Sequence, residues 1–513
     1  MKKFLILILT IPLLAAGKLP LKNVVFQAMK SNPDIMVYKY SPIQAKSMFE
    51  ASKSIFIPQF QLNASASRDQ NKPTSIFEGR GEEVKSNRQS GNLSLVQNLP
   101  TGGQINFGIT QNRNYTTNTF YQLNPSYTSI FQLTISHPLL KNMGVSVTKQ
   151  NIIISRKNYE KSLFDFRAQA SNTIFSVIQT YWNYLYYLES YGVKQDSLKL
   201  AQDLYQQNKE MVKIGTKAPL DLIEAEAEVE NRRAELIDAR NQLENAREQL
   251  MLQTGIQNIP EDPSMLEVPK LTREEIELQK MIELALRENP QVLAAKKELE
   301  SAEFQMKVKK NALKPELNFQ LVMETIGRAG TKNLYLDNNP FSGVIIGKIE
   351  GNVADSINEA LKGAYNSIQL QLVYTMPVKR QKEVNEFQAA VANYYRAKKN
   401  YEKVRAEIES QVRSAWRDAM AAYQRIKATQ KARKLAEEKL RAEQEKFAHG
   451  SSTNYMVLTY QRDLANARIN ELRAIMDYNI ALFKLKQATG TLLSYFGVSI
   501  KADEDFGGYS LIK

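Results

Sequence analysis

Four stretches of the chain alternate between apolar and polar residues with a period of two. The first and third follow a proline, and the second and fourth lead into one. Their apolar positions are Phe60, Leu62, Ala64 and Ala66; Phe131, Leu133 and Ile135; Leu317, Phe319, Leu321 and Met323; and Ile368, Leu370, Leu372 and Tyr374. This alternation predicts strands with one apolar and one polar face. It fits a half-buried strand of a soluble sheet and a lipid-facing strand equally well.

Two other stretches, 157–214 and 382–448, show an unbroken helical pattern. Neither contains proline, and only Gly192 interrupts the first. At a rise of about 1.5 Å per residue, each helix would be on the order of 85–100 Å long. Helices of this length are typical of coiled coils.

The segments that follow each long helix carry a heptad pattern. Leucine or valine recurs every seven residues in the first, and alanine fills the second seam position in both. The positions are Leu222, Val229, Leu236, Leu243 and Leu250; Ala225, Ala239 and Ala246, with Arg232 as the exception; and Ala467, Ala474 and Ala481. This pattern predicts left-handed coiled-coil packing with closely spaced helices.

A glycine stands between the helices of each pair, Gly215 in the first and Gly450 in the second. Glycine adopts positive φ at the lowest cost, which is the conformation that commonly ends a helix. Lys217 and Ser452 follow in the short polar steps. The sequence therefore predicts two antiparallel helical hairpins.

The chain is predicted to be a tandem repeat. Residues 21–33 align with 278–290, including Asn32-Pro33 with Asn289-Pro290. The offset is 278 − 21 = 257 residues there and 450 − 215 = 235 at the turn glycines, so the first copy carries 22 additional residues. We expect repeats at 18–255 and 277–490, a connector at 256–276 and a tail at 491–513.

The first residues indicate export. Two lysines, an apolar run and small residues form a predicted signal peptide at 1–17. No later stretch reaches about 18 consecutive apolar residues, so no membrane helix is expected.

The composition excludes several kinds of chemistry. The absence of cysteine excludes disulfides and thiol catalysis, and the only histidines are His137 and His449. No nucleophile–base set, phosphate-binding loop or metal-ligand spacing is present, so we expect no enzyme, cofactor or metal. The net charge of +14 favours a basic helical surface over an acidic partner. Nucleic acid binding conflicts with the export signal.

Taken in order, these elements resemble the TolC family of bacterial outer-membrane efflux proteins. The resemblance rests on the Asn-Pro helices, the strands flanked by proline and the SHPLLKN stretch at 136–142. It also rests on the turn glycines, each followed seven residues later by Leu222 or Val457. It implies a mixed α+β fold and a homotrimer in the outer membrane, with a β-barrel shared between protomers and a periplasmic tunnel of coiled-coil hairpins. The implied function is a passive exit duct for small molecules or proteins, in efflux or type I secretion. An inner-membrane pump and a periplasmic adaptor would drive it.

The resemblance also implies a periplasmic aperture at the hairpin ends. By position, Asp221 and Glu224 would line it, although both acids also suit the first turn of a helix. In the second repeat these positions hold Met456 and Thr459, and Ser452 stands where a basic residue often pairs with the neighbouring hairpin. The expected charge lock between chains is therefore in doubt.

The stretch 92–111 predicts a β-hairpin around Thr101-Gly102-Gly103 that has no counterpart in the second repeat. Either each chain adds six strands to the barrel, or this hairpin lies outside the lipid zone. The family pattern favours four strands. Residues 68–91 and 112–127 are expected to be loops, as is 327–366 apart from a short helix at 355–361.

The alternative function is an exported coiled-coil structural or adhesin-like protein with a soluble sheet. A periplasmic adaptor fits less well, because adaptors usually carry one hairpin and a membrane anchor.

Overall fold

The computed structural model describes residues 18–75, 77–78, 83–118, 120–275, 277–342, 344–498 and 500. The predicted signal peptide at 1–17 and the tail beyond residue 500 lie outside these residues. The described chain forms two compact units. One, mainly helical, comprises the described parts of Met1–Lys46, Lys157–Glu300 and Arg396–Lys513. The other, built on a sheet, comprises those of Ser47–Arg156 and Ser301–Tyr395.

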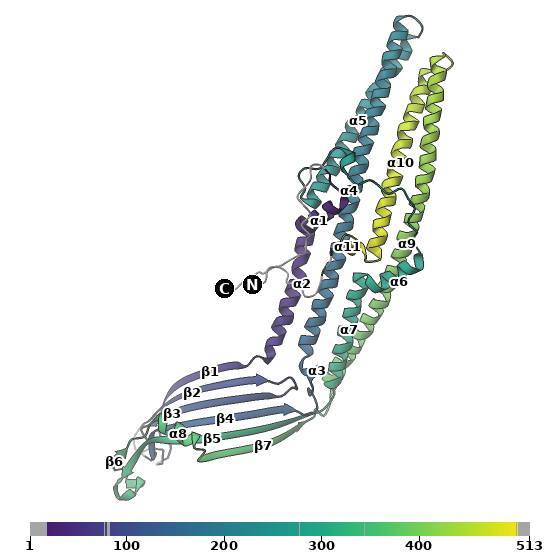
Figure 1. Ribbon diagram of the computed structural model, residues 1–513. Coiled ribbons are helices and arrows are strands. Elements are labelled where there is room, and N and C mark those ends of the chain that lie inside the picture. Colours follow the sequence, from purple (N-terminus) through teal and green to yellow (C-terminus); the bar gives the residue numbers. More distant parts are fainter. Residues whose placement is uncertain are drawn as a thin grey trace. The chain divides into compact units, whose positions relative to one another are not determined.

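The helices and strands follow the predicted order (Figure 1). The helices are α1 (Leu21–Ser31), α2 (Pro33–Ser52), α3 (Val145–Thr148), α4 (Gln150–Lys213), α5 (Pro219–Thr254), α6 (Leu278–Glu288), α7 (Pro290–Asn311), α8 (Val353–Leu361), α9 (Gln381–Ala448), α10 (Asn454–Ala488) and α11 (Leu492–Tyr495). The strands are β1 (Gln59–Asn71), β2 (Val84–Asn98), β3 (Gln104–Thr116), β4 (Leu123–Pro138), β5 (Glu316–Tyr335), β6 (Ile345–Ile349) and β7 (Tyr365–Thr375).

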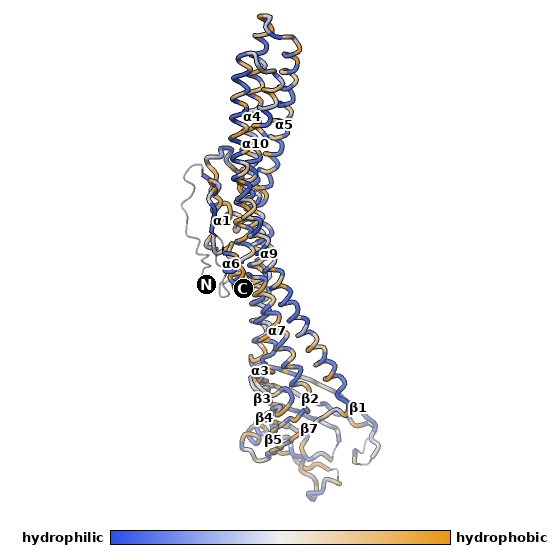
Figure 2. Tube along the Cα trace, turned by 90° about the vertical axis from the view of Figure 1, so that its right-hand side faces the viewer, coloured by the Kyte–Doolittle hydropathy of each residue, from blue (hydrophilic) through white to orange (hydrophobic). Residues whose placement is uncertain are grey.

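Two helical hairpins, α4–α5 and α9–α10, form the main part of the helical unit. Hydrophobic and hydrophilic positions interleave along them (Figure 2). Gly215 and Gly450 lie in the turns with φ values of 81° and 75°, a region that favours glycine. Pro219 is the first residue of α5, and the Thr453 side chain caps α10 by accepting from the Met456 amide. No described helix is both long and apolar enough to cross a bilayer.

The inner face of α5 coincides with the heptad positions. Ala225, Val229 and Leu250 are buried, and Leu222 and Leu236 are half-buried. The supercoil itself stays a prediction.

Arg232, the exception in the alanine seam, is also buried, with 3% of its surface exposed. Its guanidinium lies 2.5 Å from Glu228 and 3.4 Å from Glu235, which also binds Lys194 of α4 at 2.8 Å. Partial burial opposes ionisation of Glu235, but Lys194 and Arg232 outweigh it and lower its pKa. A buried charge requires such partners.

The repeated Asn-Pro motif joins each short helix to the end of a hairpin. The Asn32 amide donates to the carbonyl of Gln253 at 2.9 Å, and the Asn289 amide donates to the carbonyl of Ala488 at 2.9 Å. The oxygens of the same two side chains accept the backbone N–H of Asp34 and of Gln291, respectively. Each asparagine therefore satisfies groups at two helix ends, which would otherwise lack partners.

The sheet unit contains one antiparallel sheet with the order β1-β2-β3-β4-β5, and both β6 and β7 pair with β5. Strands β2 and β3 are the predicted extra hairpin, and they lie inside the sheet between β1 and β4. The predicted helix at 355–361 is confirmed as α8, which packs on β4 and β5 through a 2.7 Å contact between the hydroxyls of Ser129 and Ser356.

The predicted loops are longer than the loops of the structure. Residues 68–71, 84–91, 112–116 and 123–127 belong to strands, and 327–366 holds the end of β5 as well as β6 and α8. Residues 68–71, 84–91 and 112–116 are mainly polar on both faces, so the apolar alternation disappears there while the backbone hydrogen bonds to neighbouring strands continue.

Gly490 offers a stability test because it has positive φ and little space. Its φ is 77°, and an added Cβ would lie 2.7 Å from Asn289 Cα and 2.8 Å from the Glu288 carbonyl oxygen. Gly490→Ala should lower the midpoint of heat-induced loss of helical circular dichroism more than Gly450→Ala does. Gly450 has a similar φ of 75° with nothing within 4 Å, so its substitution should cost only about 1–2 kcal/mol of backbone strain. Equal losses would show that the Asn-Pro junction is not tightly packed.

Candidate functional site

The turns of the two hairpins are joined within one chain by a buried amide pair. Asn208 of α4 is fully buried, and Asn454, the first residue of α10, is 1% exposed. The Asn208 amide donates to Asn454 Oδ1 at 2.8 Å, and the Asn454 amide donates to the backbone carbonyl of Asp221 at 3.2 Å. Buried amides of this kind are costly to leave unpaired, so the pair fixes the position of one hairpin end against the other.

Lys217, in the first turn, adds a charged contact to this pair. Its ammonium donates to Asn208 Oδ1 at 3.1 Å and lies 3.9 Å from the centre of the Phe447 ring in α9. Burial lowers the pKa of Lys217, and the nearby Asp221 carboxylate partly opposes this shift. An ammonium above an aromatic face is attracted by the electrons of the ring. We call Asn208, Lys217, Phe447 and Asn454 the latch.

An apolar cluster supports the latch. It combines Leu204 from α4 and Leu440 from α9 with three residues of α10, Val457, Leu458 and Leu464. Because residues of both hairpins share this cluster, separating the hairpin ends would expose apolar surface to water.

The predicted aperture residues lie beside the latch. Asp221 contributes its carbonyl to Asn454. Glu224 and Thr459 line a groove of about 270 Å³ between α5 and α10, together with Tyr455 and Arg462. Met456 is half-buried in the first turn of α10. The structure therefore brings Glu224 and Thr459 together within one chain, and the aperture role of all four residues stays a prediction.

Ser452 pairs within its own hairpin. Its hydroxyl donates to Glu443 at 2.6 Å, and Lys446 lies 3.4 Å from the same carboxylate. The Ser452 hydrogen bond, followed by Lys446, lowers the pKa of Glu443. The serine at this position thus stabilises its own turn.

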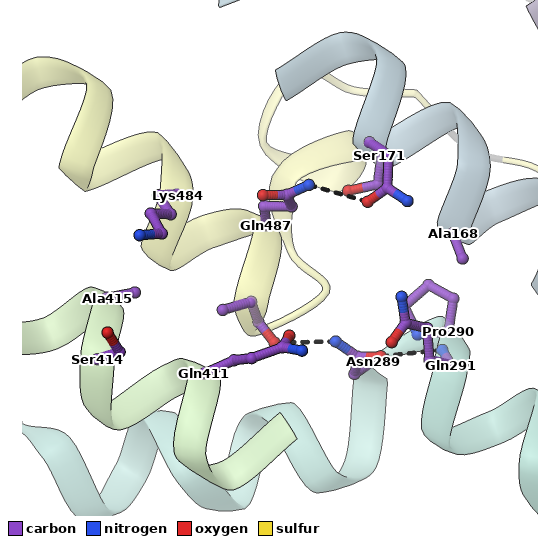
Figure 3. Close-up of a pocket in the computed structure, with 12 residues that line it drawn as sticks. Ala168, Ser171, Asn289, Pro290, Gln291, Gln411, Ser414, Ala415, Lys484 and Gln487 are labelled. Atoms are coloured by element: carbon purple, nitrogen blue, oxygen red, sulfur yellow. Dashed lines mark hydrogen bonds between the residues drawn. The ribbon is translucent and has the colours of Figure 1, made fainter. Parts of the chain in front are cut away.

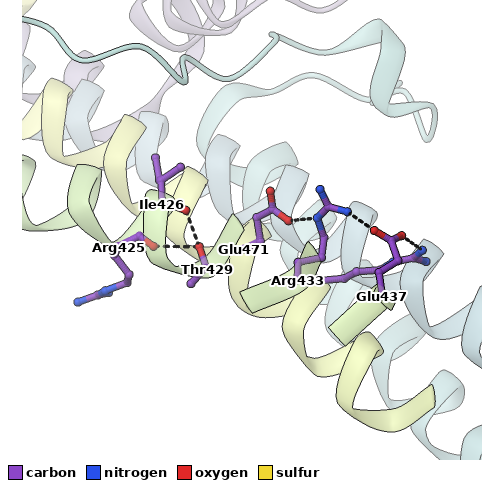
Figure 4. A network of polar contacts seen from close by, with 7 residues as sticks. Arg425, Ile426, Thr429, Arg433, Glu437 and Glu471 are labelled. Atoms are coloured by element: carbon purple, nitrogen blue, oxygen red, sulfur yellow. Dashed lines mark hydrogen bonds and ion pairs between the residues drawn. The ribbon is translucent and has the colours of Figure 1, made fainter. Parts of the chain in front are cut away.

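Further from the turns, an ionic network connects α9 to α10 (Figure 4), and one of its arginines also reaches α4. Arg433 of α9 binds Glu471 of α10 at 2.5 Å and Glu437 at 2.8 Å. Arg468 binds Glu437 at 3.3 Å and lies 3.9 Å from Asp196 of α4. Exposed pairs of this kind contribute little individually, but a shared network fixes the register of the helices.

A polar cavity of about 340 Å³ lies where α4, α9, α10 and the α6–α7 junction meet (Figure 3). Gln487 donates to Asn172 at 2.9 Å across it, and Asn289 is engaged with Ala488 and Gln291. Its side chains thus serve packing between helices. No group of acidic or histidine side chains suited to a metal occurs among the described residues.

Sequence reasoning missed the latch. Asn208 and Asn454 belong to no motif. The only sequence feature that could have revealed them is a polar residue among the mainly apolar positions on the buried face of its helix. Phe447 is separated from Lys217 by 230 residues, so only folding reveals the contact.

Long helical hairpins combined with an antiparallel sheet are the mixed α/β fold of outer-membrane channels of known structure. The sequence profile described as "Outer membrane efflux protein" matches residues 104–255 and 281–491. The chain therefore belongs to the outer membrane efflux protein family and is an efflux channel of the outer membrane that extends into the periplasm. The family is one of channel proteins, and its match favours a conduit over an adhesin-like protein.

Solved structures show the same fold. The CmeC outer membrane channel of Campylobacter jejuni has 16% identity and a TM-score of 0.64, over 95% of this chain and 87% of that chain. The open state of the Neisseria gonorrhoeae MtrE outer membrane channel has 16% identity and a TM-score of 0.60, over 93% and 90%. Comparison with curated protein sequences finds no match.

The amide pair predicts a specific pattern of stability. Asn208→Leu removes the donor to the buried Asn454 Oδ1 and should reduce local stability at the hairpin ends by about 1–3 kcal/mol. Amide hydrogen exchange of 204–217 should accelerate accordingly. The exposed Asn241→Leu is the control, and adding Asn454→Leu to Asn208→Leu should recover part of the loss, because no orphaned amide remains. Additive losses in the double variant would contradict the pairing.

Proposed function

We propose that three copies of this chain form one passive exit duct. Their sheets would close a shared β-barrel in the outer membrane, and their coiled-coil hairpins would enclose a periplasmic tunnel. The main support is that, among the described strands, β1 and β7 each pair on one side only and leave the sheet open at both edges. In lipid, unpaired backbone groups are too costly, so an open sheet has to be closed by further strands. One chain has too few strands to close around an aqueous channel.

The chain itself would supply no energy. A periplasmic adaptor and an inner-membrane pump would deliver small molecules or proteins to the tunnel, as in efflux or type I secretion. We further propose that 18–255 and 277–490 are structural repeats separated by the connector at 256–276 and followed by the tail at 491–513. The equivalent Asn32 and Asn289 junctions support this division.

The gate would lie at the hairpin ends. Asp221 and Glu224 of three chains would bring six carboxylates close together and favour cations at the mouth. Met456 and Thr459, which are neutral, would make the second hairpin's part of the ring uncharged. The latch would hold the two hairpins of each chain together in the closed state, and opening would move one hairpin away from the other.

The carboxylates give a test of the aperture. The double variant Asp221→Asn, Glu224→Gln should reduce the preference for cations, measured as reversal potential in planar bilayers under a salt gradient. The matched control is Glu226→Gln with Glu230→Gln, which removes two exposed carboxylates from the same helix. Unchanged selectivity would remove Asp221 and Glu224 from the constriction.

The latch gives a test of the gate. Lys217→Met removes the ammonium from Phe447 and Asn208 while keeping a long side chain, so it should destabilise the closed state by about 1 kcal/mol. We expect an open probability several times higher in single-channel recordings. Lys213→Met is the control because this lysine is exposed, four residues earlier. The same increase in both variants would attribute the effect to net charge and refute the latch.

The proposal as a whole depends on assembly in the membrane. We expect a heat-sensitive trimer on electrophoresis and a protein that stays with outer membranes after carbonate extraction. A monomer in the soluble periplasmic fraction with an intact sheet would refute it and favour the coiled-coil structural protein.

A further inference from the structure

The hairpin β2–β3 extends the full length of the sheet. Thirteen residue pairs join β1 to β2, from Gln59–Val96 to Asn71–Val84. Pairing continues without a bulge through β2–β3 and β3–β4. Because β2 has 15 residues and β3 has 13, both exceed the 9–11 residues that a tilted strand needs to cross the hydrocarbon core.

The short turn of this hairpin lies at the proline-bearing end of the sheet. Gln97 donates to the carbonyl of Phe56, and His137 Nε2 lies 3.0 Å from the Thr101 hydroxyl. An added Cβ on Gly103 would lie 2.6 Å from the His137 ring. The hairpin is therefore in register with β1 and β4, so its strands lie at the same height in the sheet as these two neighbours.

One face of the sheet carries an unbroken apolar row across six strands. Residue pairing connects its members in the order Phe60, Leu95, Phe107, Leu133, Met323 and Ile368. These large side chains are exposed in a single chain, except for Leu133, which is half-buried; Phe60 is 66% exposed and Phe107 43%. An apolar band of this kind is what lipid chains cover in membrane barrels.

The opposite face is polar at the same height. The row one position along the strands is Gln61, Ser94, Gly108, Gln132, Glu324 and Ser367. A charged or amide side chain fits a water-filled lumen, whereas it would be costly in lipid. The hairpin strands thus have the same arrangement as β1, β4, β5 and β7, with apolar residues on one face of the sheet and polar residues on the other.

We propose that the hairpin β2–β3 is part of the membrane wall and that its outer face, Leu93, Leu95, Ile105, Phe107 and Ile109, contacts lipid acyl chains. This inference rests on the proposed trimer. Each chain then contributes six strands, because β6 pairs only with Lys332–Tyr335 of β5, beyond the stretch paired with β7. Three chains form a barrel of eighteen strands.

The consequence is a wide outlet. With strands about 4.8 Å apart and tilted by about 40°, eighteen strands give a backbone diameter of roughly 36 Å, against roughly 24 Å for twelve. Barrels of 16–18 strands leave an open aqueous channel. The barrel is therefore wide enough for bulky cargo, and the narrowest part of the channel lies elsewhere along its length.

Four single-cysteine variants test the inference, since the natural chain has no cysteine. Phe107→Cys and Leu133→Cys lie side by side on the apolar face, and Asn106→Cys and Thr134→Cys are paired on the polar face. Each full-length protein is labelled with bimane and placed in vesicles that contain lipids brominated on their acyl chains. We expect loss of fluorescence at positions 107 and 133. Positions 106 and 134 should keep their fluorescence and be quenched by aqueous iodide.

The two strands separate the possible failures. Quenching by brominated lipid at 133 without quenching at 107 would overturn the hairpin assignment and leave the channel intact. Absence of quenching at both would refute the membrane sheet, and with it the proposed function. Electron microscopy of the purified assembly in nanodiscs provides a count that needs no variant: eighteen wall strands support the inference, and twelve contradict it.

Discussion

The requirement that every backbone polar group in lipid has a hydrogen-bond partner governs this protein. A sheet is compatible with the hydrocarbon region only if its edges are closed. Among the described strands, the sheet of one chain ends at β1 on one side and at β6 and β7 on the other. For a member of an outer-membrane family this has a structural consequence: in the proposed assembly the sheet of one chain is an incomplete wall, and other copies would complete it.

In the helical unit the main requirement is a different one, namely that very long helices stay in register with one another. Its hairpins have small or aliphatic residues at the seam, and some of the buried polar side chains are paired with one another. Arg232 lies between two glutamates, and Asn208 faces Asn454. Such pairs contribute less net stability than apolar packing does, but they disfavour displaced registers, in which they would lose their partners. The asparagines of the Asn-Pro motif act similarly at the other end of the hairpins by fixing where each descending helix stops.

A latch at the hairpin ends suits a gate because its parts are individually weak. One ammonium–aromatic contact, one amide pair and a small apolar cluster together hold the hairpins. If the proposed gate lies here, a partner that contacts the hairpin ends would have to supply only a few kcal/mol to exchange these contacts for its own. The hydrogen bond between Ser452 and Glu443 lies within the second turn, whereas the latch connects one hairpin end to the other.

Much of the fold is local in origin, and the sequence by itself determined it. The period of seven in α5, the glycines at both turns and the alternation in β1, β4, β5 and β7 follow from the geometry of one helix, turn or strand, so each can be recognised within its own segment. Loop boundaries were misjudged where strands are polar on both faces, because hydrogen bonding between strands leaves no mark on side-chain chemistry. Only the tertiary structure decided that β2–β3 lies within the sheet and that Lys217 meets Phe447 and Asn208. Both depend on residues far apart in the chain, and periodicity within a segment does not encode which distant segment lies beside it.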